Sequence, residues 1–158
     1  MVDWMHKQAT SRRSETAELN TSLRMKAILE NVPRAVECVT EWAQKAGFDE
    51  RALYEIQLAV DEACANVVDH AYQGADPGDI EVSCRLDGEI LTVQVRDWGR
   101  GFDLASVEDP DLDAPLEERS LGGLGLFLVR QVMDDVRFTA NPELGNELMM
   151  SKRLQIAG

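Results

Sequence analysis

Apolar residues recur at helical spacing in three segments of the chain. In the first, about residues 33–46, they return every three or four positions, and Gly47 follows where a left-handed residue ends many helices. The second segment begins after Asp49 and continues to about residue 71, and the third covers about residues 125–135. The pattern predicts three amphipathic helices, each with one face turned toward a core.

Alternation of apolar and polar residues over about 80–97 predicts a β-hairpin. Asp87 and Gly88 form a favoured two-residue turn between its arms. Folding about this turn places Cys84 opposite Leu91, Val82 opposite Val93 and Ile80 opposite Val95. These apolar side chains then share one face. Asp97 lies two residues after Val95, so its carboxylate is expected to point to the same inward face at the end of the strand.

An inward carboxylate at position 97 is costly unless it finds hydrogen-bond donors. The amino group of a ligand, directly or through a water, would supply one. Alternatively, Asp97 caps the turn that follows it, because Asp-x-Gly turns are common. From this segment alone, the two interpretations are about equally supported.

Further elements complete a two-layer fold. An edge strand is expected over about 22–29, and closing strands near 136–140 and 147–154. Together with the helices and the hairpin, they predict an α/β (α+β) fold, a two-layer sandwich in which helices cover one face of a mixed, mostly antiparallel sheet. Residues 1–21 are polar and irregular and are expected to form a flexible N-terminal extension, which leaves one domain over 22–158.

Composition narrows the class of protein. The chain has 158 residues, 44% of them hydrophobic, and a formal net charge of −13. The acidic balance disfavours direct nucleic-acid binding, which relies on Lys and Arg meeting phosphate. No apolar run reaches the length of a membrane span, and the three cysteines form no CxxC pair. A soluble cytoplasmic protein is therefore expected, with its cysteines as small buried hydrophobic residues.

The second helix carries one polar pair of interest. Glu62 and Asn66 are four residues apart, so they neighbour each other about one turn apart, away from the apolar stripe. When the helix is considered alone, an ordinary polar helix face is the preferred interpretation of this pair. Its significance depends on what the rest of the chain brings beside it.

Two glycine-bearing segments follow that helix. Asp97 is followed by Gly99 and Gly101 at the end of a strand, and Gly122-Gly123-Leu124-Gly125 opens the third helix, where backbone N–H groups can hold phosphate. The polar connection 102–121 between them is long enough to be a lid or binding loop. Each segment alone is a weak signal, but their order, spacing and settings together predict one ATP site.

These residues resemble a known family. The set Glu62…Asn66, Asp97-x-Gly99-x-Gly101 and Gly123-Leu124-Gly125 is similar to the N, G1 and G2 boxes of the GHKL ATPase superfamily, which has the Bergerat-type ATP-binding fold. More narrowly, residues 58–72 and 122–134 resemble bacterial anti-sigma factor serine/threonine kinases. The resemblance covers about residues 22–156. It departs at Leu121, where many relatives carry the first glycine of a fuller Gly-x-Gly-x-Gly.

The resemblance implies a role for each motif residue. Glu62 would be the general base, directed at a serine hydroxyl of a protein substrate, and Asn66 would coordinate the Mg²⁺ that bridges the phosphates of ATP. Asp97 would accept the adenine amino group. The other residues would bring the backbone close to the base, fold the lid or contact the phosphates: Gly99, Gly101, Arg119, Gly122, Gly123, Leu124 and Gly125.

The resemblance also implies partners. Such kinases phosphorylate a STAS-domain antagonist and hold a sigma factor or another regulatory target, and they are often homodimers. An alternative is a non-catalytic, nucleotide-dependent binding module of the same fold, which would have no need of Glu62. A detached catalytic domain of a sensor histidine kinase is disfavoured, because neither His6 nor His70 lies in the helical hairpin that such an acceptor requires.

Overall fold

The computed structural model describes residues 19–73, 75–99, 121–141 and 143–155. The five strands are β1 (Leu19–Lys26), β2 (Asp79–Asp87), β3 (Ile90–Asp97), β4 (Asp135–Asn141) and β5 (Gly145–Arg153). The helices are α1 (Val32–Ala46), α2 (Glu50–Asn66) and α3 (Leu121–Val132), with a short 3₁₀ turn (Leu29–Asn31) before α1. A π-helical turn, η2 (Val67–Ala71), continues α2.

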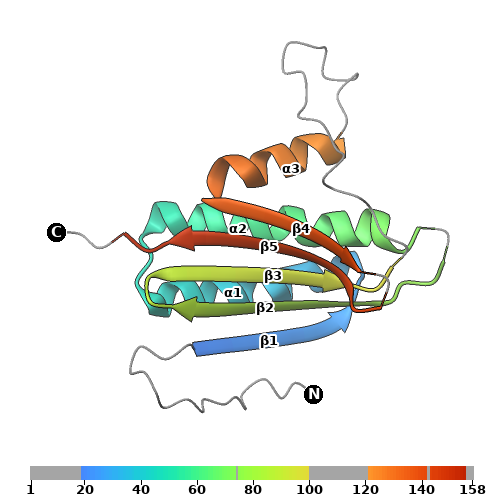
Figure 1. The fold of residues 1–158 in the computed structure, drawn as a ribbon, viewed down its shortest axis with the longest axis horizontal. Coiled ribbons are helices and arrows are strands. Elements are labelled where there is room, and N and C mark those ends of the chain that lie inside the picture. Colours follow the sequence, from blue (N-terminus) through green and yellow to red (C-terminus); the bar gives the residue numbers. More distant parts are fainter. Residues whose placement is uncertain (1–18, 74, 100–120, 142, 156–158) are drawn as a thin grey trace, which may run out of the picture.

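The strands form one sheet in the order β1-β2-β3-β5-β4. Each of the four neighbouring pairs is antiparallel. Helix α1 packs against β2, α2 against β3 and α3 against β4, so the helices follow the sheet from one side to the other (Figure 1). The predicted two-layer fold with a mostly antiparallel sheet is confirmed, and no parallel pair occurs among the described strands. Residues 1–18, which make up most of the predicted extension, lie outside the described residues.

The core lies between the helices and one face of the sheet. Fully buried residues such as Val39 of α1, Ile56 of α2, Val129 of α3 and Val93 of β3 come from both layers. The alternation predicted for the hairpin explains this, because every second residue is buried along β3 and along β2 as far as Cys84. The core therefore joins α2, α3 and the central strands into one packed unit.

The opposite face of the sheet is polar. There, Arg24 pairs with Asp79 at 3.0 Å and Arg96 pairs with Glu147 across neighbouring strands. Antiparallel sheets commonly leave one face to solvent in this way. The side chains available for an enclosed site are consequently those on the helix-covered face.

The predicted hairpin has the right face but a shifted register. Gly88 and Glu89 form its turn, so Cys84 lies opposite Val93, Val82 opposite Val95 and Ile80 opposite Asp97. The predicted pairs were wrong by two residues, which keeps every side chain on its face. The reason is that Gly88 adopts φ +64°, and both common two-residue hairpin turns need a positive φ at their first position.

Helix boundaries follow the local signals, with one correction. Gly47 ends α1 with φ 106°, and the Asp49 side chain caps α2 by accepting a hydrogen bond from the Ala52 N–H at 2.9 Å. Helix α3 begins at Leu121, four residues before the predicted start, so it contains the glycine segment. Packing of α3 against α2 outweighs the low helix propensity of those glycines.

The three cysteines are free, and two of them, Cys64 and Cys84, are buried. Burial raises the pKa of the Cys64 thiol to about 12, so it stays protonated and unreactive at neutral pH. This agrees with the prediction of small buried hydrophobic residues for Cys64 and Cys84, whereas Cys38 is only half-buried. Within the described ranges, no helix is both long and apolar enough to cross a membrane.

Candidate functional site

Helix α2 positions the first two predicted residues. Glu62 and Asn66 lie one turn apart near its C-terminal end, and the neighbouring Ala63 and Cys64 are buried in the core. Since those small residues let α2 sit close to the sheet, the polar pair lies at the edge of the helix-covered layer. Both side chains are half-buried, and thus neither belongs to an ordinary solvated helix face.

The Glu62 carboxylate packs against the start of α3. A β-carbon added to Gly125 would lie 2.5 Å from the Glu62 Oε1 atom, closer than real β-carbons approach an oxygen. Gly125 is therefore the residue that leaves room for the carboxylate. Burial, with a smaller contribution from the charge of Asp61, raises the pKa of Glu62 above its ordinary value. A carboxylate with a raised pKa, close to a helix start, is typical of a catalytic base.

Asp97 ends β3 and points inward as predicted, with only 7% of its surface exposed. Its Oδ1 atom accepts one hydrogen bond from the Gly99 N–H and another from the Asn146 side-chain amide, each at 2.9 Å. Asp97 thus caps the turn that follows it, which was one of the two interpretations. The same carboxylate also lines a cavity, so capping does not exclude the second interpretation, in which Asp97 accepts a hydrogen bond from a ligand.

The cavity lies between the end of α2 and the sheet. It offers about 20 Å³, enough for about one water molecule, and both Asn66 and Asp97 line it. Apolar walls surround these two polar groups and come from α2, η2, β3, β4 and β5: Ala63, Val67, Ala71, Val95, Phe138 and Leu148. The fold has therefore brought together two predicted residues that are far apart in the sequence, in a mostly apolar setting with room for about one water.

Asn66 also fits the predicted metal role. Its Nδ2 atom is buried and has no hydrogen-bond partner in the described part of the chain. A buried N–H donor without a partner is costly, and an acceptor atom of a ligand would satisfy it. The Oδ1 atom of the same amide, not Nδ2, is the hard ligand of the kind Mg²⁺ takes. No group of three or more metal-ligating side chains forms among the described residues. The metal role of Asn66 stays a prediction.

The two glycine segments have different structural roles: the first allows a close approach of two backbone segments, and the second begins a helix. A β-carbon at Gly99 would overlap the carbonyl oxygen of Ala71, so glycine is required where this turn meets the end of α2. Gly122, Gly123 and Leu124 belong to the first turn of α3, whose N–H groups have no partner within the helix.

The remaining expectations concern the start of α3 and the segment between β3 and α3. Gly125 is the fifth residue of α3, so its own N–H belongs to the helical ladder. Gly101 and Arg119 lie outside the described residues, as does the predicted lid over 102–121 except for Leu121, which begins α3.

Two residues of the site escaped the sequence analysis. Asn146 is buried and bonds to Asp97, because the pairing of β3 with β5 sets these two residues opposite each other. The Tyr72 hydroxyl donates a hydrogen bond to the Asp79 carbonyl at 2.7 Å and accepts one from the Trp98 N–H at 3.0 Å. The sequence alone held no signal for either, since both depend on contacts between distant segments.

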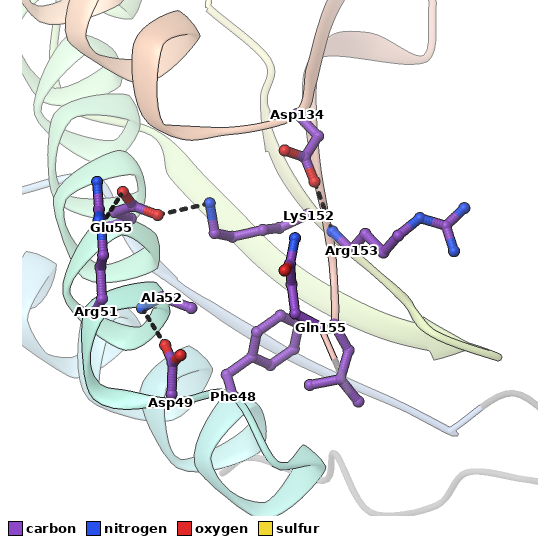
Figure 2. A pocket seen from close by; sticks show the side chains of 10 residues that line it. Phe48, Asp49, Arg51, Ala52, Glu55, Asp134, Lys152, Arg153 and Gln155 are labelled. Carbon is purple, nitrogen blue, oxygen red and sulfur yellow. Dashed lines mark hydrogen bonds and ion pairs between the residues drawn. The ribbon is translucent and has the colours of Figure 1, made fainter. Parts of the chain in front are cut away.

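A second, larger cavity lies at the other end of α2, and Figure 2 shows its walls. It measures about 320 Å³ and contains none of the predicted site residues. The Lys152 side chain extends from β5 to α2, where its ammonium contacts Glu55 Oε1 at 2.8 Å (Figure 2). The ammonium also donates a hydrogen bond to the Val132 carbonyl at 2.5 Å. A cation at this last carbonyl of α3 stabilises the helix end.

Comparison with known proteins places the chain in a family. The Histidine kinase-like ATPase domain family matches residues 25–152. The Serine-protein kinase RsbW of Oceanobacillus iheyensis is 32% identical over 114 residues, which are 70% of this chain and 71% of that protein. The Listeria monocytogenes protein of the same name is 38% identical over 99 residues, 60% of this chain and 63% of that one. The Bacillus cereus protein is 32% identical over 117 residues, 72% and 71% of the two chains.

These matches agree with the motifs. The family match spans the helix with Glu62 and Asn66, the end of β3 and the start of α3. The relatives named are serine-protein kinases, the class of enzyme that the sequence resemblance predicts. The predicted family is confirmed: the chain belongs to the histidine kinase-like ATPase domain family, in which it resembles bacterial serine-protein kinases.

Proposed function

We propose that this chain is an ATP-dependent serine-protein kinase that phosphorylates a STAS-domain antagonist and, in alternation, binds a sigma factor or another regulatory target. The observation that carries the proposal is the packing of the Glu62 carboxylate on α3 at Gly125, one turn from Asn66. A nucleotide-binding module without catalysis has no use for a half-buried carboxylate at this point. The relatives named serine-protein kinase support the same reaction.

Each residue acts by its own chemistry. Asp97 accepts a hydrogen bond from the adenine amino group, directly or through one water, for which the cavity beside Asp97 has room. The N–H groups at the start of α3, those of Gly122, Gly123 and Leu124, bind the phosphates. The Asn66 amide oxygen and the nucleotide would hold Mg²⁺, which would supply positive charge next to the transferred group.

Glu62 then serves the chemical step. The hydroxyl oxygen of the substrate serine attacks the γ-phosphorus, the bond from that phosphorus to the β–γ bridging oxygen breaks, and ADP leaves. The serine proton passes to the Glu62 carboxylate. Its raised pKa makes Glu62 a better proton acceptor than an exposed carboxylate. Because phosphoryl transfer depends mainly on positioning, the Gly125 contact contributes by fixing where this carboxylate lies.

Partner exchange is the second half of the proposal. An antagonist and a target that compete for one nucleotide-dependent surface shift the kinase between two complexes by their difference in affinity. The chain is expected to act as a cytoplasmic homodimer, which light scattering of the purified protein tests. A pull-down with and without ATP tests target binding.

Intact-mass spectrometry tests the catalytic half. A STAS-domain protein is incubated with Mg-ATP and the wild type, Glu62→Gln or the matched control Glu41→Gln, in which an exposed glutamate of α1 is changed. We expect one phosphoryl group on a serine with the wild type and with Glu41→Gln. The Glu62→Gln variant should bind ATP but lose transfer by about 100-fold or more, as for a removed general base.

The outcomes separate the alternatives. Transfer by Glu62→Gln at the wild-type rate would exclude Glu62 as the base. ATP binding by the wild type without transfer to any STAS-domain protein would instead favour the nucleotide-dependent binding module.

A further inference from the structure

Tyr72 joins three segments around the proposed adenine-binding site. It follows η2, at the end of the helix that carries Asn66. Its hydroxyl donates a hydrogen bond to the carbonyl of Asp79, the first residue of β2, at 2.7 Å. The same oxygen accepts a hydrogen bond from the N–H of Trp98, directly after β3, at 3.0 Å. One side chain therefore links the helix wall of the cavity to the strand end that forms its other wall.

The Tyr72 ring is held in place from a further side. A β-carbon at Gly78 would lie 2.6 Å from the Tyr72 Cε1 atom, so the ring fills the space that a side chain there would need. The Gly78 carbonyl in turn accepts a hydrogen bond from the Ala27 N–H at 2.8 Å, which ties this loop to the end of β1. The hydroxyl is thus presented by a ring with little freedom to move.

The contact at Trp98 bears on its neighbour Asp97. The Asp97 carboxylate is oriented by its bonds to the Gly99 N–H and to Asn146. The Gly99 N–H can hold that orientation only while the backbone of the 97–99 turn is fixed. Tyr72 fixes this turn through the N–H of Trp98, and the close approach of Gly99 to Ala71 supports it from the helix side.

We infer that Tyr72 is a positioning residue for base recognition, which aims the Asp97 carboxylate into the cavity shared with Asn66. The inference rests on the proposed function, because it takes the ligand at Asp97 to be the adenine of ATP. Tyr72 does not line the cavity, so it acts through the 97–99 turn.

The ionisation state of the phenol suits this role. Burial is the largest influence on the pKa of Tyr72 and raises it; the charges of Asp97 and Asp79 also raise it, while the Trp98 hydrogen bond and the Arg24 charge lower it. The net effect is upward. The hydroxyl therefore remains protonated at physiological pH and can donate to one carbonyl while accepting from one N–H.

The test compares ATP with inosine triphosphate, whose base carries a carbonyl where adenine carries the amino group. Calorimetry gives the dissociation constants of both for the wild type and Tyr72→Phe, which keeps the ring but loses both hydrogen bonds. Tyr54→Phe is the matched control, because Tyr54, the only other tyrosine of the chain, is 65% exposed on α2. We expect the preference for ATP to fall about 5-fold in Tyr72→Phe, the effect of one typical hydrogen bond, and to stay unchanged in Tyr54→Phe.

A purely structural role would give a different result. It would weaken the binding of ATP and of inosine triphosphate by the same factor. An unchanged preference for ATP in Tyr72→Phe would therefore overturn the inference, while leaving the proposed adenine site at Asp97 intact. If the wild type binds ATP without preferring it to inosine triphosphate, recognition at Asp97 is wrong and the inference falls with it. Should Tyr72→Phe not fold, Gly78→Ala is used instead, because its methyl group displaces the Tyr72 ring. The same ratio of the dissociation constants of inosine triphosphate and ATP then decides.

Discussion

Replacing Gly125 with alanine should separate the stability of this protein from its activity. The new methyl group would lie 2.5 Å from Glu62 Oε1, whereas ordinary contact begins at 3.4 Å. The Glu62 carboxylate must therefore withdraw by about 1 Å. Since misplacing a catalytic group by about 1 Å can cost on the order of 100-fold in rate, phosphotransfer should fall by about that factor.

The same change should not unfold the protein. Gly125 lies inside α3, where alanine is favoured over glycine by about 1 kcal/mol. Turning the Glu62 side chain away from its rotamer costs a similar amount, about 0.5–1.5 kcal/mol, so the net change in unfolding free energy is expected to be close to zero. In a Glu62→Ala background the obstacle is gone. There, Gly125→Ala should raise the melting temperature by about 2–4 °C.

Three measurements make up the assay. Phosphotransfer rates come from intact mass, ATP affinity from calorimetry, and stability from thermal unfolding of the two single variants and the double variant. An unchanged rate in Gly125→Ala would refute the assignment of Glu62 as a base held at this contact. A weaker affinity for ATP with an unchanged rate would instead place Gly125 in phosphate binding, as the sequence resemblance implies.

Two further predictions concern charged side chains on α2 and in contact with it. Asp61→Asn removes a charge that raises the pKa of Glu62. The acid limb of the rate–pH profile, where protonation of the base stops activity, should therefore move to lower pH. An unmoved limb would exclude Glu62 as the titrating base. Lys152→Met removes the buried ammonium that joins Glu55 to the Val132 carbonyl, and urea unfolding should show a loss of about 2 kcal/mol; an unchanged midpoint would contradict this.

Much of the fold could be predicted because its signals are local. The alternation in the hairpin identified the buried face and the inward direction of Asp97. Gly47 and Asp49 marked helix boundaries by backbone conformation and capping, which depend on only a few neighbouring residues. Even the error in register preserved the face, because a shift of two residues leaves side-chain direction unchanged.

The rest depended on contacts between distant segments. Asn146 becomes a partner of Asp97 only through the pairing of β5 with β3, and its sequence neighbours carry no sign of this. The start of α3 was misplaced because glycine has a low intrinsic helix propensity, which packing against α2 overrides. Glu62 was found as a motif residue, but its contact with Gly125 required the two helices to be placed side by side.

That placement is set at two points with matching spacing. Glu62 contacts α3 at Gly125, and Glu55 reaches α3 through Lys152, which bonds to the carbonyl of Val132. On each helix the two points are seven residues apart, about two turns or roughly 10 Å, and they run in opposite directions along α2 and α3. An antiparallel pair fixed at both points cannot slide. The Glu55–Lys152 ion pair therefore helps to set where the first turn of α3, with the N–H groups proposed to bind phosphate, meets Glu62, the proposed catalytic base.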